Sequence, residues 1–118
     1  MENLETCSCE IVHQEAVDAA AAVLPPLGEL EPLGEFFKVL TDATRLKLLY
    51  ALGTGELCVC DLSVVSGASV SSVSHHLAAL KRVRLVKSRR DGRIIYYSLD
   101  DDHIHGILRY ALDHLGEE

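Results

Sequence analysis

The sequence contains four cysteines, arranged as two Cys-x-Cys pairs, and these residues have the clearest capacity for chemistry. One pair is Cys7 with Cys9, near the start of the chain, and the other is Cys58 with Cys60. Residues two apart share a face only where the backbone is extended or enters a helix, since within a regular helix they point about 200° apart. Gly55, just upstream, allows such a backbone. The second pair is therefore predicted to chelate one soft metal ion.

Two thiolates do not complete the coordination shell of Zn(II), Cd(II) or Pb(II). The N-terminal segment offers Cys9 together with either Cys7 or His13, and the spacing leaves both choices open. An all-thiolate shell favours Cd(II) or Pb(II), whereas a histidine in the shell favours Zn(II). The competing interpretation is that Cys58 and Cys60 are small buried residues of a short helix.

A second set of candidate ligands lies near the C-terminus. His103 and His114 would share one face of a helix but lie about 16 Å apart along its axis, too far for bonds of about 2 Å to one ion. Antiparallel packing of two copies about a twofold axis would bring Asp101 and His103 of one protomer to the other's C-terminal end. There, His114 and Glu117 would complete a nitrogen and oxygen shell that suits zinc. The alternative is that these are surface residues at helix ends, with Asp101 as a cap.

The elements that must position these residues are centred on residues 57–85. A short apolar helix over 61–65 is joined by Ser66-Gly67-Ala68 to a longer helix, which Ser69 is placed to cap. Two short helices joined by a tight glycine-containing turn are typical of a helix-turn-helix, whose second helix enters the DNA major groove. In that second helix the predicted inward residues are Val70, Val73, Leu77 and Leu80, and the outward ones are Ser71, Ser72, His75, Ala78 and Arg82.

A basic hairpin is predicted directly after this helix. Two short strands flank Asp91-Gly92, which is a strong turn signal. Arg89, Arg90 and Arg93 cluster near the tip. A hairpin of this kind is the wing of a winged helix and is able to lie along the sugar-phosphate backbone. The predicted fold class is therefore mainly α with a two-stranded β wing, a winged helix-turn-helix.

Three helices are predicted ahead of the helix-turn-helix, over residues 15–24, 31–40 and 43–52. Pro25-Pro26 end the first, and Asp42 is placed to cap the third. In the third helix, Leu46, Leu49 and Tyr50 are expected to face inward.

The last helix, predicted over residues 100–114, carries an apolar stripe that is too broad to leave in water. It is expected to pack against its own domain and against a second copy, so that the protein is a homodimer. We therefore expect residues 1–14 to form a metal-binding arm, and residues 15–118 to form the winged helix-turn-helix domain with N- and C-terminal dimerisation helices. The stripe consists of Ile104, Ile107, Leu108, Ala111, Leu112 and Leu115.

The net charge of −7 is unusual for a DNA-binding protein, but residues 41–98 hold nine Lys and Arg against four Asp and Glu. There is no apolar run of about eighteen residues and no signal peptide at the start, so we expect a cytoplasmic protein with no membrane partner. Thiols stay reduced in that compartment. Because no nucleophile, phosphate-binding loop or substrate cleft is evident, we expect neither an enzyme nor a small-molecule substrate.

These residues carry a resemblance to the ArsR/SmtB family of metal-responsive winged-helix repressors, and most of all to its CadC-like cadmium, lead and zinc sensors. The resemblance covers nearly the whole chain. The matching segments are residues 42–46, 56–62, 73–77, 91–93 and 97–100, followed by the Asp-x-His and His-x-x-Glu patterns of the last helix.

The resemblance implies a homodimer that binds double-stranded operator DNA without metal and releases it when metal binds, which de-represses efflux or sequestration genes. The residues that match the family's DNA-contacting segment are Ser71, Ser74 and His75. Cys58 and Cys60 match its soft-metal box, and the four C-terminal candidates match its interfacial site. The chain departs from the usual Cys-Glu-x-x-Cys arm, so the arm ligands stay open. A thiol-based redox sensor built on the same winged helix is the alternative function.

Overall fold

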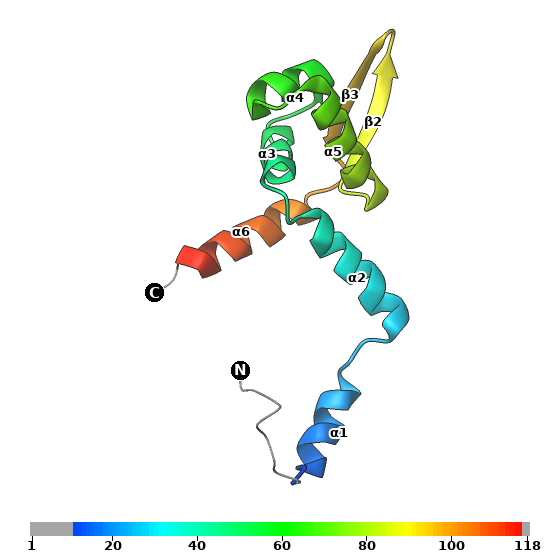
Figure 1. Cartoon of the computed structure of the whole chain (residues 1–118), viewed down its shortest axis with the longest axis vertical. Helices are drawn as coiled ribbons and strands as arrows, with labels where there is room; N and C mark the ends of the chain where they lie inside the picture. The colour runs from blue at the N-terminus through cyan, green and yellow to red at the C-terminus, as the bar shows by residue number, and fades with distance from the viewer. Residues whose placement is uncertain (1–10, 117–118) are drawn as a thin grey trace. The chain divides into compact units, whose positions relative to one another are not determined.

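The computed structural model describes residues 11–116 of the 118-residue chain. The chain divides into two compact units, Met1–Pro32 and Leu33–Glu118. Within the described range, no helix is both long and apolar enough to cross a lipid bilayer. The elements in order are α1 (Gln14–Ala22), α2 (Leu27–Val39), α3 (Ala43–Leu52), β1 (Leu57–Cys58), α4 (Val59–Ser66), α5 (Val70–Arg82), β2 (Val86–Asp91), β3 (Ile94–Leu99) and α6 (His103–Gly116) (Figure 1).

Helix α1 is rich in alanine, the strongest helix former, and ends ahead of the two prolines as predicted. Helix α2 begins at Leu27, so the predicted start at residue 31 was wrong. Proline is usually confined to the first turn of a helix because it donates no backbone hydrogen bond. Here α2 continues through Pro32 and loses one such bond.

The core of the second unit is built by α3, α4, α5 and the first half of α6. Helix α3 buries Leu48, Leu49 and Leu52, whereas Tyr50, which was expected inside, is 46% exposed. The buried face of α3 is therefore rotated away from the predicted one. The largest fully buried side chains are Leu48, Leu49, Leu62, Leu77, Leu80, Ile104 and Val73.

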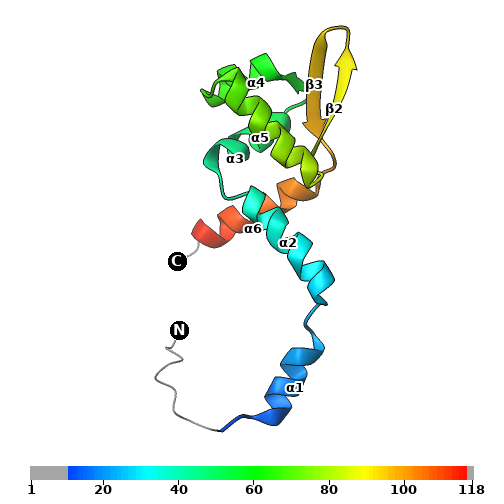
Figure 2. The ribbon, with the colours of Figure 1, turned by 45° about the vertical axis from the view of Figure 1, so that its right-hand side comes forward.

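The sheet has three antiparallel strands in the order β1-β3-β2. Strands β2 and β3 form the predicted hairpin, with Gly92 in the turn at a φ of 66° that suits glycine. Both views place this hairpin alongside α5 (Figures 1 and 2). The predicted winged helix-turn-helix is confirmed, and the sheet gains the two-residue strand β1, which is too short to show a periodic pattern in the sequence.

In helix α6, the buried apolar side chains lie in the first half, and the apolar side chains of the second half are exposed. Ile104 and Leu108 are buried in the domain, whereas Leu112 and Leu115 are 57% and 77% exposed. Figure 1 shows the C-terminal half of α6 extending away from α3. Packing of the stripe against its own domain is confirmed for the first half, and packing of the second half against another copy stays a prediction.

Candidate functional site

Helix α5 is held in place by its buried face and by its cap. The Ser69 side chain accepts a hydrogen bond from the Ser72 N–H at 3.0 Å, as predicted. Val73 and Leu77 are completely buried, whereas Val70 is 48% exposed. Of the predicted DNA-contacting residues, Ser72 is half-buried, and the exposed ones are Ser71, Ser74 and His75. The exposed face thus carries short polar side chains that allow close approach to base edges.

The turn between α4 and α5 is fixed by its own hydrogen bonds. Gly67 has a φ of 77°, a left-handed conformation that few residues other than glycine adopt. Ser63 Oγ donates to the Ala68 carbonyl at 2.6 Å, and Ser66 Oγ accepts from the Ala68 N–H at 3.2 Å. These bonds fix the direction in which α5 leaves α4.

The three predicted wing arginines are all exposed, but they differ in their partners. Arg89 forms an ion pair with Glu56, with Nε 2.6 Å from the carboxylate Oε2. Arg90 Nη1 donates to the Gly92 carbonyl at 3.4 Å, and Arg93 stands beside the turn. The sequence showed the cluster but not the ion pair, whose two members are 33 residues apart.

Cys58 and Cys60 lie where β1 ends and α4 begins. Cys58 is the N-cap residue of α4 with an extended backbone (φ −90°, ψ 173°), and Cys60 is in the first helical turn. This is the backbone that chelation by residues two apart requires. Both thiols are free, with Cys58 half-buried and Cys60 exposed. The interpretation of both as buried helix residues is therefore wrong for Cys60.

Asp61 adds negative charge beside this thiol pair. Its Oδ2 accepts the Cys58 N–H at 3.1 Å. That bond, followed by one to the Cys58 side chain, lowers the pKa of Asp61. A bound cation would neutralise the carboxylate and the thiolates together, so the donor chemistry fits a soft divalent ion.

An open groove of about 510 Å³ connects the thiol pair to the predicted DNA-contacting elements. Cys58 and Cys60 line it together with Ser74 from α5 and Arg93 from the wing. The apolar remainder is Val59, Val70, Ile94 and Ile95. A chemical change at Cys58 or Cys60 would therefore occur next to both α5 and the wing.

The C-terminal candidates are only partly brought together within one chain. Asp101 and His103 are adjacent at the start of α6: Oδ1 accepts the His103 N–H at 2.9 Å, and Oδ2 lies 3.2 Å from Nδ1. The His103 side chain is 88% exposed. His114 is exposed near the other end of the same helix, and Glu117 lies outside the described residues. Asp101 therefore acts as the cap that the alternative reading expected, while its second oxygen faces His103.

The predicted arm ligands Cys7 and Cys9 also lie outside the described residues, and His13 is exposed just before α1. Between residues 11 and 116 there is no cluster of three or more His, Cys, Asp or Glu side chains that would hold an ion. Each predicted site takes part of its shell from residues beyond this range or from a second copy, so the ligand sets stay predictions.

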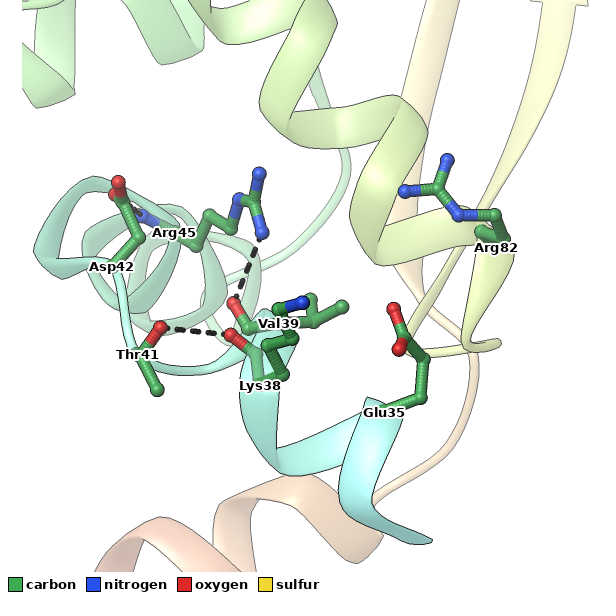
Figure 3. A pocket seen from close by; sticks show the side chains of 7 residues that line it. All are labelled: Glu35, Lys38, Val39, Thr41, Asp42, Arg45 and Arg82. Carbon is green, nitrogen blue, oxygen red and sulfur yellow. Dashed lines mark hydrogen bonds between the residues drawn. The ribbon is translucent and has the colours of Figure 1, made fainter. Parts of the chain in front are cut away.

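A polar network that the sequence did not reveal joins α2, α3 and α5, and Figure 3 shows the part of it between Arg45 of α3 and the Val39 carbonyl of α2. Arg45 Nε donates to His76 Nδ1 at 2.9 Å, and its Nη1 donates to the Val39 carbonyl at 3.3 Å. Asp42 caps α3 by accepting from the Thr44 and Arg45 N–H groups, and chiefly the Arg45 N–H lowers its pKa. Through Arg45, His76 thus links α5 to the end of α2.

Comparison with known proteins places this arrangement among transcriptional regulators. The sequence profile of the arsR family of bacterial regulatory proteins matches residues 42–88. The chain is 43% identical to a transcriptional repressor SmtB homolog from Synechocystis, over 98% of this chain and 88% of that one. It is 36% identical to a cadmium resistance transcriptional regulatory protein CadC homolog from Staphylococcus aureus, over 96% and 93%.

A solved structure gives the same fold. The homodimeric winged helix-turn-helix DNA-binding domain of a possible ArsR-family regulator from Mycobacterium bovis superposes with a TM-score of 0.65 at 25% identity, covering 78% of this chain and 92% of that one. That domain is a winged helix-turn-helix, the arrangement that α4, α5 and the β2–β3 hairpin form in this chain.

Proposed function

Since the chain belongs to the ArsR family of bacterial regulatory proteins, a class of DNA-binding transcription regulators, we propose that it is a metal-sensing repressor. In this proposal the metal-free homodimer binds double-stranded operator DNA and leaves it when Cd(II), Pb(II) or Zn(II) binds, so that efflux or sequestration genes are expressed. The protein acts by binding alone and has no catalytic role. The observation that carries the proposal is the groove that the thiol pair shares with Ser74 and Arg93.

DNA recognition is assigned to the exposed residues of α5 and the wing. Ser71, Ser74 and His75 would contact base edges in the major groove, with Ser72 at the margin. Arg90 and Arg93 would contact phosphates beside it, and Arg89 would join them once it leaves Glu56. The two recognition helices of a dimer must match half-sites about 34 Å apart, so affinity depends on how the two chains are joined.

Metal acts in this proposal through its different affinity for two dimer geometries, because a ligand shifts only an equilibrium whose states it distinguishes. Cys58 and Cys60, with arm ligands from among Cys7, Cys9 and His13, would fix the start of α4. Between two chains, Asp101 and His103 would meet the C-terminal end of the partner's α6, where His114 and Glu117 are found in sequence. A coupling of about 1–3 kcal/mol would weaken operator binding roughly 5- to 150-fold.

The decisive experiment removes the thiols. Operator duplex is selected from a random library by the metal-free protein, and its binding is followed by fluorescence anisotropy during titration with Cd(II), Pb(II) and Zn(II). We expect Cys58→Ser/Cys60→Ser to bind the duplex as the wild type does without metal and to lose its response to Cd(II) and Pb(II). A Val64→Ala variant, altered at an 84% exposed position of the same helix, is the control that keeps the response.

If the double variant leaves the operator at the same metal concentrations as the wild type, the thiol pair is not the site through which metal causes release. Release of the metal-free wild type by peroxide, blocked by the same substitutions, would instead establish the redox alternative.

The interfacial site is tested by stoichiometry. His103→Ala should lower the number of Zn(II) ions bound per dimer, because one ligand of each symmetric site is lost. Asp113→Asn changes an exposed acidic residue on the same helix that is not in the predicted ligand set, and it should leave the number unchanged. Calorimetric titration gives both values, and equal stoichiometry in His103→Ala and wild type would assign Asp101 and His103 to helix capping alone.

A further inference from the structure

Glu56 and Arg89, the latter in strand β2 of the wing, form a doubly hydrogen-bonded ion pair. Arg89 Nε donates to Glu56 Oε2 at 2.6 Å, and Nη2 donates to Oε1 at 2.8 Å. The guanidinium carbon also lies 4.9 Å from the centre of the Tyr96 ring. Asp91 is more distant, with Oδ2 3.9 Å from Nη1. Glu56 is therefore the main partner of Arg89, and the pair has the planar fork geometry of the stronger surface ion pairs.

Each member of this pair favours the charged form of the other. Hydrogen bonds from Arg89 lower the pKa of Glu56, and the same bonds raise the pKa of Arg89. The carboxylate occupies two N–H donors of the guanidinium that a DNA phosphate would also use, because both anions match the same fork. A DNA phosphate that approaches this edge of the guanidinium therefore makes a bidentate contact only after Arg89 releases Glu56.

The sheet register connects this ion pair to the thiol pair. Cys58 is opposite Tyr96 in the β1–β3 ladder, and Tyr96 is opposite Arg89 in the β2–β3 ladder. These three residues form one row across the sheet, and residues directly opposite each other lie on the same face. Glu56 precedes Cys58 by two residues, the repeat of a strand. Only Leu57 separates Glu56 from Cys58 along the chain.

From this geometry we propose that Glu56 is a positioning residue that competes with DNA phosphate for the Arg89 guanidinium, and that ion capture by Cys58 and Cys60 strengthens its hold. The part that concerns metal rests on the proposed function, whereas the competition for Arg89 concerns the metal-free chain alone.

The direction of the effect follows from what DNA binding requires. In the metal-free chain, β1 is only two residues long, so Glu56 is free to move away when Arg89 turns to a phosphate. Ligands that fix Cys58 and Cys60 would also fix β1, which Glu56 directly precedes. The exchange of carboxylate for phosphate then becomes less favourable, and the wing loses a backbone contact whatever the base sequence.

The test uses the full-length metal-free protein and a labelled random-sequence duplex, because a backbone contact does not depend on sequence. Glu56→Gln should raise affinity roughly 1.5- to 5-fold, the range that a surface ion pair is worth. Asp91→Asn makes the same charge change in the wing and preserves the turn as Asn-Gly. It should give a smaller gain, which measures the general electrostatic effect.

A double-mutant cycle separates competition from a general charge effect. Arg89→Ala should weaken binding and reduce the steepness of the salt dependence by about 0.9, the value of one phosphate contact. In the Arg89→Ala background, Glu56→Gln should give only the small gain of Asp91→Asn. Thermal unfolding of each variant shows whether the fold is intact, and an unfolding temperature close to wild type for Glu56→Gln is expected.

An equal gain from Glu56→Gln with and without Arg89, or a gain no larger than that of Asp91→Asn, would overturn the competition. The link to the thiol pair is read from Cd(II). The factor by which Cd(II) weakens binding to the selected operator should be smaller in Glu56→Gln than in Asp91→Asn, and equal factors would overturn that link. If the wild type does not respond to Cd(II), the proposed function fails, while the metal-free cycle still decides the competition.

Discussion

The leucine side chains of α3, α4 and α5 are largely buried within one chain, whereas those of the terminal helices are largely exposed. Leu62 and Leu77 are completely buried in the helix-turn-helix. Phe37 in α2 is 51% exposed and Leu115 in α6 is 77% exposed, and α1 has no buried residue at all. All of these residues belong to amphipathic or apolar segments, so the difference lies in whether a partner surface is present.

This difference indicates that DNA contact and dimerisation depend on different parts of the chain. The part that is predicted to contact DNA shares one closed core with the first half of α6, while the exposed parts of the terminal helices carry apolar surface of the kind that marks protein interfaces. A homodimeric relative with the same fold agrees with this division. We therefore expect folding and dimerisation to respond to different substitutions.

The largest effect is expected from the closed core. Leu77→Ala removes a fully buried side chain from α5 and should lower the free energy of unfolding by about 2–5 kcal/mol, because it combines lost burial with a cavity. Urea denaturation at fixed protein concentration measures it. Val70→Ala, in the same helix but 48% exposed, is the control with the smaller loss. Equal losses would show that α5 is not anchored as described.

The next effect is expected at the exposed stripe of α6. Leu115→Glu should raise the dimer dissociation constant about 100-fold, equivalent to roughly 3 kcal/mol, because an unpaired charge would enter an apolar interface. Sedimentation equilibrium measures the constant, and circular dichroism should show an intact fold. Asp113→Ala, on the same exposed turn, is the control. A Leu115→Glu variant that stays dimeric would place the interface elsewhere.

The smallest effect concerns Asp42, where the two regions meet along the sequence. Asp42→Ala should cost about 1 kcal/mol at neutral pH through loss of the α3 cap. Because the folded-state pKa of Asp42 is below its ordinary value of 3.8, the stabilisation is present at neutral pH and is lost as pH falls through that lower pKa. The difference between Asp42→Ala and wild type should thus shrink in acid.

Much of the fold could be predicted because local chemistry determines it. Asp42 and Ser69 cap the helices they were predicted to cap, and Gly92 forms the hairpin turn. The sequence did not reveal β1, since two residues carry no periodicity and the strand exists only because β3 pairs with it. The start of α2 was misplaced because a helix that continues through Pro32 goes against the usual position of proline.

The places of several candidate residues in the fold were predictable, but the contacts between distant residues were not. The spacing of Cys58 and Cys60 correctly required a backbone that enters a helix. The pairing of Arg89 with Glu56, and of Arg45 with His76, depends on tertiary contacts between residues more than 30 positions apart, for which charge patterns in the sequence give no signal. Each pairing gives one residue a role that its type alone did not suggest: Arg89 forms an ion pair with Glu56, and His76 accepts a hydrogen bond from Arg45.

The separation of His103 and His114 along one helix would affect the metal concentration at which the protein responds. If the two ends of α6 belong to one ion site only when two chains meet, occupancy depends on protein abundance as well as on the metal. A dilute protein would then need a higher metal level to respond than a concentrated one. The cell would set its detection threshold partly by how much of this chain it makes.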